Sequence, residues 1–157
     1  MADTAKPVIS PEVIEQVVLG IPHCHAMGVG FVSVSPGHAT LSLPWREDLV
    51  GDPESGVLAG GVVTSLIDTV CGMAVWSSLT RFMQIATLDL RIDYLRPATK
   101  GAMLHASAHC YKVTRSVAFV RGTAFHPDKP DDLVATCVGA FMLDSTASRQ
   151  ARNSVPA

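Results

Sequence analysis

The chain has 157 residues, of which 48% are hydrophobic and 17% are charged. These proportions exclude a disordered chain and predict one globular domain with a buried core. The formal net charge at pH 7 is −2 and no basic run occurs, so we expect neither nucleic acid nor an anionic membrane as the main partner.

Both ends of the chain are polar, which sets the expected domain limits. We predict a flexible N-terminus over residues 1–9, a single domain over 10–144 and a polar C-terminal tail over 145–157. The first ten residues contain no apolar stretch of the kind found in secretory signals. The four cysteines form no CxxC pair, so we expect reduced thiols in a cytoplasmic protein. They are Cys24, Cys71, Cys110 and Cys137.

One short motif, His23-Cys24-His25, resembles a metal-ligand cluster. Its spacing is too tight for a tetrahedral zinc site without further ligands, and none is near in the sequence. We therefore predict a structural or surface role for this motif, no metal and no cofactor.

Turn residues divide the first third of the chain. Ser10 and Pro11 are typical of a helix start, and we expect a short helix that runs to about Leu19 and stops at Gly20 and Pro22. Two strands, over residues 27–35 and 38–44, should flank a hairpin turn at 35–37. Residues 46–56 are polar and predict a loop.

The longest apolar segment, residues 60–79, predicts a helix that is apolar nearly all round and therefore buried. The segment 57–79 is long enough to span a bilayer. Asp68 near its centre would then cost about 2.5–3.5 kcal/mol on insertion, and Ser and Thr residues dilute its hydrophobicity. The sequence therefore favours a core helix inside a soluble fold.

Four strand-like runs follow, over residues 85–95, 102–113, 117–126 and 133–143. Short turns join them, so the sheet should be antiparallel. In residues 88–94 apolar and charged residues alternate, so one face of this strand should pack inward and the other should face solvent. The first face carries Leu88, Leu90, Ile92 and Tyr94, and the second carries Asp89, Arg91 and Asp93. The predicted architecture is α+β: a curved antiparallel sheet of about five to six strands wrapped around one long central helix, with a short N-terminal helix.

Asp68 is the only charged residue in residues 56–80. An ionised carboxylate in such surroundings is either paired, solvated or used chemically. A structural Asp that faces a solvated groove or bonds a neighbouring turn remains an alternative, since perturbed acids are enriched at functional sites but not confined to them.

Gly60 and Gly61 lie where the long helix should begin. The first amides of a helix have no internal partner and the dipole is positive there, so such an end can polarise a carbonyl and hold an oxyanion. The alternative is a plain helix start in which glycine only supplies backbone freedom.

The spacing of these residues predicts a dimer. Asp68 follows Gly60 by eight residues, which is about 12 Å of helix. A base and an oxyanion donor must both reach one carbonyl, each within about 3 Å. Asp68 would therefore serve the helix end of a second chain, in a homodimer with two composite sites.

Three segments carry a family resemblance. They are GDPESGVLAGGVVTSLIDTVCGMA at 51–74, ATLDLRIDYLRPATKGAMLHASA at 86–108 and LVATCVGAFML at 133–143. They resemble the hotdog-fold acyl-CoA thioesterases of the phenylacetic-acid-degradation (PaaI) type, in the 4HBT-like thioesterase superfamily. The resemblance covers about residues 49–143 and implies a hotdog fold, an acyl-CoA substrate and a homodimer that assembles into a homotetramer.

The resemblance also implies roles for individual residues. Asp68 matches the general base or nucleophile, and Gly60 or Gly61 matches the backbone donor to the thioester carbonyl. Thr87 matches a hydroxyl near the attacking water in some members. Simple alternation, however, places Thr87 on the same face as Asp89, unless a bulge intervenes. Positions expected beside the substrate or its phosphates are Asp52, Ala59, Val62, Arg96 and Arg115.

Two positions depart from the family pattern. The family usually has His before the Gly-Gly pair, where this chain has Ala59, and commonly Asn before the loop proline, where this chain has Asp52. An ionised carboxylate cannot donate a hydrogen bond and repels an oxyanion. Asp52 therefore either points elsewhere or leaves the site dependent on backbone donors.

The leading functional prediction is hydrolysis of an acyl-CoA thioester. An alternative is a hotdog protein that binds acyl-CoA with little or no turnover, which the departures at Ala59 and Asp52 favour. Hydration or dehydration of an acyl thioester on the same fold is a further alternative, although the helix carries no His and acid pair suited to it.

Overall fold

The computed structural model describes residues 9–144. Predictions for residues 1–8 and for the tail 145–157 lie outside the described residues. The main helices are α1 (Pro11–Gly20), α2 (Pro22–Met27) and α3 (Gly60–Ser78), with a 3-10 turn η1 (Glu47–Leu49). The strands are β1 (Gly30–Ser35), β2 (His38–Leu43), β3 (Val50–Asp52), β4 (Val57–Leu58), β5 (Gln84–Tyr94), β6 (Leu104–Val113), β7 (Val117–His126) and β8 (Lys129–Asp144).

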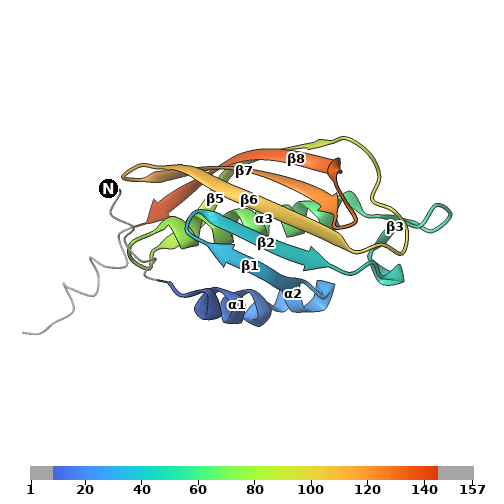
Figure 1. Cartoon of the computed structure of the whole chain (residues 1–157), viewed down its shortest axis with the longest axis horizontal. Coiled ribbons are helices and arrows are strands. Elements are labelled where there is room, and N and C mark those ends of the chain that lie inside the picture. Colours follow the sequence, from blue (N-terminus) through green and yellow to red (C-terminus); the bar gives the residue numbers. More distant parts are fainter. Residues whose placement is uncertain (1–8, 145–157) are drawn as a thin grey trace, which may run out of the picture.

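A six-stranded sheet in the order β1-β2-β6-β7-β8-β5 curves around α3, and every neighbouring pair is antiparallel (Figure 1). Helices α1 and α2 lie beside β1, and α1 also contacts α3. The predicted α+β architecture, with one long central helix and a short N-terminal helix, is confirmed. Strand β5 forms one edge of this sheet.

The core lies between α3 and the concave face of the sheet. Small side chains at Ala118, Ala124 and Ala135 are fully buried there and let the helix approach the strands. By length and composition α3 could cross a membrane, but more than half of it is buried within the described protein. This is the position of a core helix, as predicted.

The loop and the N-terminal region contain more structure than predicted. Pro22 does not end the helical region but opens α2 at its first position, where a proline costs no hydrogen bond. The strand expected from Met27 therefore begins at Gly30. The predicted loop 46–56 contains η1 and β3, and β3 pairs with β4, which follows the loop, to form a two-stranded hairpin.

Strand β5 departs from simple alternation at one residue. The pairing with β8 shifts between Thr87 and Asp89, which marks a bulge at Leu88. Leu88 is 57% exposed, whereas Leu90 and Ile92 pack against the core. The expectation that Leu88 faces inward is therefore wrong. The bulge adds one residue to the strand, so the side chains before it point to the opposite face from the one that simple alternation predicts.

Close packing of β5 on β8 depends on Gly139. A Cβ at this position would lie 2.9 Å from the Asp89 carbonyl oxygen and 3.0 Å from the Leu90 side chain. We expect Gly139→Ala to lower the free energy of unfolding by about 1–3 kcal/mol, the usual cost of overpacking, as measured by urea denaturation. The matched control is Gly20→Ala, where nothing lies within 4 Å. Equal stability of the Gly139 variant and the wild type would contradict this packing.

Candidate functional site

One face of α3 is left open by the sheet. Its residues are exposed or only partly buried, while the rest of the helix carries the core. The open face comprises Gly60, Gly61, Thr64, Ser65 and Asp68. Strand β5 borders it on one side and α2 on the other, through the contacts described below. A ligand or a second chain can therefore reach the polar side chains of this open face.

Asp68 has a hydroxyl partner from β5. The Thr87 hydroxyl donates a hydrogen bond of 2.8 Å to Asp68 Oδ1. The bulge at Leu88 turns Thr87 toward the helix, so the structure brings together two residues that alternation alone would separate. Within residues 9–144 no cation pairs with Asp68 and its second oxygen, Oδ2, accepts no hydrogen bond. Oδ2 therefore remains available to bind a proton or a water molecule.

The start of α3 leaves two amides for a ligand. The amides of Val62 and Val63 donate to the Ala59 carbonyl, at 3.0 and 3.4 Å, and the Ala59 amide donates to Leu49. Since the first amides of a helix have no internal acceptor, the Gly60 and Gly61 N–H groups remain. Val62 thus offers no free amide, and its side chain packs against the core.

Tyr94 braces this helix start, a contact that the sequence did not reveal. Its hydroxyl donates to the Gly60 carbonyl at 2.8 Å and lies 2.8 Å from the Thr64 hydroxyl. The Thr64 hydroxyl is itself 3.0 Å from the same carbonyl. The available signal was the inward position of Tyr94 in the predicted strand, which indicated burial but no polar partner.

Asp52 is engaged in its own turn. Its carboxylate accepts hydrogen bonds from the amides of Glu54 and Ser55, at 3.2 and 3.3 Å, and from the Ser55 hydroxyl. The Ser55 hydroxyl, followed by the Glu54 amide, lowers the pKa of Asp52 below its ordinary value. Asp52 therefore stabilises the turn between β3 and β4 as an ionised group. It does not supply a hydrogen-bond donor to the start of α3.

The two arginines predicted to meet phosphates lie apart within one chain. Arg96 donates to the Asp132 carbonyl at 2.7 Å and forms an ion pair with the Asp132 side chain at 2.9 Å. It lines a cavity of about 370 Å³ beside Gly60. Arg115 lies near the opposite end of α3, in a hollow of about 320 Å³ that also includes Arg81.

Helix α2 contributes a histidine to the open face. His23 Nε2 lies 3.1 Å from the Ser65 hydroxyl, which donates to the Gly61 carbonyl at 2.9 Å. When the Ser65 hydroxyl donates its proton to Gly61, His23 Nε2 is the donor in this pair. All four cysteines are free and buried. In residues 9–144 no group of three potential ligands is placed to hold a metal ion.

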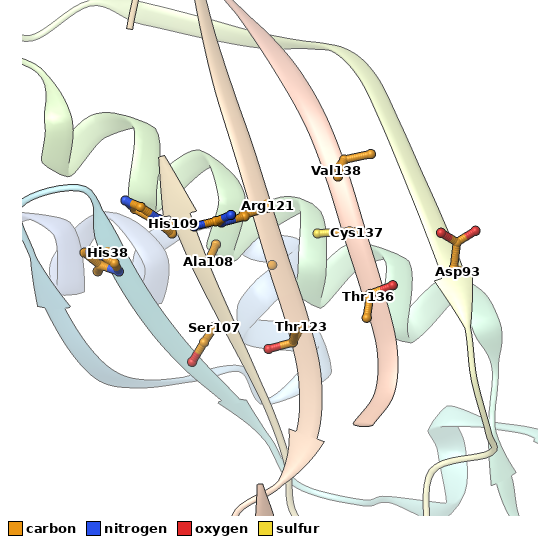
Figure 2. A pocket seen from close by; sticks show the side chains of 11 residues that line it. His38, Asp93, Ser107, Ala108, His109, Arg121, Thr123, Thr136, Cys137 and Val138 are labelled. Atoms are coloured by element: carbon orange, nitrogen blue, oxygen red, sulfur yellow. The ribbon is translucent and has the colours of Figure 1, made fainter. Parts of the chain in front are cut away.

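Two cavities differ in their relation to the open face. The cavity beside Gly60 has apolar walls from Val57, Leu58, Val63 and Val134. A larger hollow of about 470 Å³ lies on the outer side of the sheet, over β6, β7 and β8 (Figure 2). It is lined by Ser107, Thr123 and Thr136, which pair across adjacent strands and point away from α3. Of these two cavities within residues 9–144, the one beside Gly60 adjoins the open face of α3.

Comparison with known proteins identifies relatives of this chain. Residues 55–131 match the thioesterase superfamily. The medium/long-chain acyl-CoA thioesterase YigI of Escherichia coli is 30% identical over 120 residues, which are 68% of this chain and 77% of YigI. A Halobacterium salinarum protein described as an esterase is 38% identical over 84 residues, or 52% of this chain. That match spans 56%, about half, of the halobacterial protein.

Solved structures share the fold. A Pseudomonas aeruginosa protein is 39% identical, with a TM-score of 0.75, over 87% of this chain and 98% of that one. A mutant of the phenylacetic acid degradation protein PaaI from Thermus thermophilus is 26% identical, with a TM-score of 0.67, over 77% and 97%. The predicted resemblance to PaaI-type hotdog thioesterases is confirmed.

The Asp52 turn makes a measurable prediction. The pKa of Asp52 is lowered chiefly by Ser55, so Ser55→Ala should raise it toward its ordinary value. Carboxyl NMR titration measures this shift, and Ser33→Ala on β1 serves as the control. Because the folded pKa is the lower one, the stabilising effect is present above the unfolded pKa and is lost as pH falls through the folded pKa. An unchanged pKa in Ser55→Ala would show that the turn does not hold this carboxylate.

Proposed function

This chain belongs to the thioesterase superfamily, which supports thioester hydrolysis in general, and we propose that it is a homodimeric acyl-CoA thioesterase. The observation that carries the proposal is the open face of α3, where two free amides and a free carboxylate oxygen lie eight residues apart. Each proposed site combines Asp68 of one chain with Gly60 and Gly61 of the other.

The proposed chemistry uses these groups as follows. Asp68 Oδ2 takes a proton from a water molecule as that water attacks the thioester carbonyl carbon. The Thr87 hydroxyl, bonded to Oδ1, holds the carboxylate in one orientation. Charge that develops on the carbonyl oxygen is stabilised by the Gly60 and Gly61 amides and by the positive end of the helix. The carbon–sulfur bond then breaks and the thiol leaves with the proton. In the alternative, the Asp68 carboxylate attacks the carbonyl carbon, the thiolate leaves as an anhydride forms, and water then hydrolyses the anhydride to release the acid and restore the Asp68 carboxylate.

Helix spacing defines the symmetry of the proposed dimer. If Asp68 lies opposite the partner's Gly60 or Gly61 in an antiparallel pair, the two-fold axis passes α3 close to Thr64 and Ser65. Strand β5, the edge of the sheet, borders this same face of α3. An edge strand presents unpaired backbone groups, so pairing of β5 with its copy across the axis would extend the sheet while the helices meet.

The surroundings of Gly60 suit an apolar acyl group. The adjacent cavity of about 370 Å³ is walled mainly by aliphatic residues, and apolar walls favour a hydrocarbon chain over a charged one. The related YigI is named for medium and long acyl chains. We assign the same substrate class here. Arg115 lies in a hollow beside Ser78, and Ser78 is about 15 Å of helix from Asp68. We assign Arg115, together with Arg96, to the phosphates of coenzyme A.

A second candidate is acyl-CoA binding without efficient turnover. The specific observation behind it is that Ala59 offers no imidazole and that the Asp52 carboxylate is held in its own turn. Under this alternative, acyl-CoA raises the melting temperature but no thiol is released. The hydrolysis proposal expects both effects.

The role of Asp68 is tested by Asp68→Asn, which keeps the shape and removes the base. We expect kcat/KM to fall about 100-fold or more, the usual contribution of general base catalysis. The measurement is thiol release from short, medium, long and aromatic acyl-CoAs. Asp89→Asn, an exposed carboxylate on the outer face of β5, is the matched control. Wild-type turnover by a folded Asp68→Asn protein would refute the proposal.

The composite site is tested by complementation. Gly61→Pro removes the amide donor, and proline is compatible with the first turn of a helix. Asp68→Asn and Gly61→Pro should each be nearly inactive alone. After refolding together, heterodimers carry one intact site, so activity should recover to about 25% of wild type if subunits mix randomly in an isologous dimer. No recovery, with heterodimers demonstrated by mass spectrometry, would place both groups of a site in one chain.

A further inference from the structure

Tyr94 ends β5 beside the first turn of α3, and its hydroxyl reaches the carbonyl of the Gly60–Gly61 peptide. We propose that Tyr94 is a positioning residue that makes the Gly61 N–H a stronger and better-oriented donor to the oxyanion. The inference rests on the proposed function and extends it to a residue that does not touch the reacting atoms.

Three oxygens form a closed cluster at this point. Tyr94 Oη lies 2.8 Å from the Gly60 oxygen, Thr64 Oγ1 lies 3.0 Å from it, and the two hydroxyls are 2.8 Å apart. The two hydroxyls have one proton each to donate, so two protons are shared among these three contacts. In every arrangement that makes hydrogen bonds, at least one hydroxyl proton is donated to the Gly60 oxygen. When only one is, the other hydroxyl donates to the first and strengthens it.

The peptide unit transmits this interaction to the neighbouring amide. The carbonyl of Gly60 and the N–H of Gly61 belong to one conjugated peptide group. A hydrogen bond that draws electron density to the carbonyl oxygen leaves the N–H more positive and a better donor, in the manner of hydrogen-bonded chains. The Gly61 N–H is the amide that matters here, because the next one, of Val62, is already bonded to Ala59.

Tyr94 also fixes the direction of this amide. Gly60 and Gly61 have no side chains to hold the helix start, and a Cβ at Gly61 would meet nothing within 4 Å. The hydroxyl of Tyr94 ties the first turn to the end of the sheet, which is the rigid element of the fold. Donors that are held in place before the reaction cost no reorganisation when charge develops.

Burial alone does not explain the tyrosine. Its side chain is 50% exposed, whereas both contacts of its hydroxyl have defined polar partners. The other tyrosine, Tyr111, is also 50% exposed, but it lies on β6 with the Arg121 guanidinium over its ring. The pair therefore offers a matched comparison between a tyrosine at the helix start and one that is remote from it.

The test compares Tyr94→Phe with Tyr111→Phe by steady-state thiol release and by the proton chemical shift of the Gly61 amide. For Tyr94→Phe we expect kcat to fall about 10-fold with KM changed less than twofold, a smaller loss than removal of a direct oxyanion donor. The Gly61 amide proton should move upfield, as a weaker donor does. Tyr111→Phe should change neither quantity.

A second substitution, at Thr64, keeps the inference testable if Tyr94→Phe fails to fold. Thr64→Val removes the other hydroxyl and should also lower kcat and move the Gly61 amide upfield, while Thr64→Ser should restore both. Unchanged kcat in Tyr94→Phe, with turnover abolished in Asp68→Asn, would overturn this inference and leave the proposed function standing. If the wild type releases no thiol, the proposed function fails and the amide shift decides alone. A Gly61 shift in Tyr94→Phe no larger than in Tyr111→Phe would then overturn the inference.

Discussion

The axial rise of α3 is the constraint on which the proposed site depends. It separates the free amides of Gly60 and Gly61 from the carboxylate of Asp68 by about 12 Å, too far for one carbonyl to contact both. The fold holds both groups on the same open face. A second copy of that face, turned by a two-fold axis, brings each carboxylate to the other helix start, which is why the chemistry and the symmetry are proposed together.

Strand β5 ties both ends of this arrangement to the sheet. Near its beginning Thr87 bonds Asp68, and at its end Tyr94 bonds the Gly60 carbonyl. These two contacts lie seven residues apart, an odd number that would put the side chains on opposite faces of a regular strand. The bulge at Leu88 supplies the one extra residue that places both on the helix side. Gly139 on β8 then lets β5 lie close enough for these contacts to form.

The sequence was sufficient for the architecture because the architecture follows from local patterns. Alternation in the strands and an apolar helix with a single charge predicted a sheet wrapped around α3. It was not sufficient for features defined by pairing. The bulge at Leu88 exists only relative to β8, and the contacts of His23 with Ser65 and of Tyr94 with Gly60 join segments 42 and 34 residues apart. The Asp52 turn could have been predicted, since Asp directly before Pro, with Ser three residues after the Asp, is typical of a turn.

The departures at Ala59 and Asp52 and the cluster at Tyr94 all concern which groups donate hydrogen bonds to an oxyanion at the start of α3. Without an imidazole at position 59, and with the Asp52 carboxylate held by Ser55 and Glu54, neither of the two positions that depart from the family pattern supplies a side-chain donor to an oxyanion at the helix start. The two backbone amides must then supply most of the stabilisation, so their strength and orientation matter more than in a site with a side-chain donor. A tyrosine that polarises the Gly60–Gly61 peptide acts on that remaining donor. The residues of the site and the hydrogen bonds around it therefore support the same proposal. Strand β5 orients the start of α3, and the backbone amides there stabilise the oxyanion without a side-chain donor from position 52 or 59.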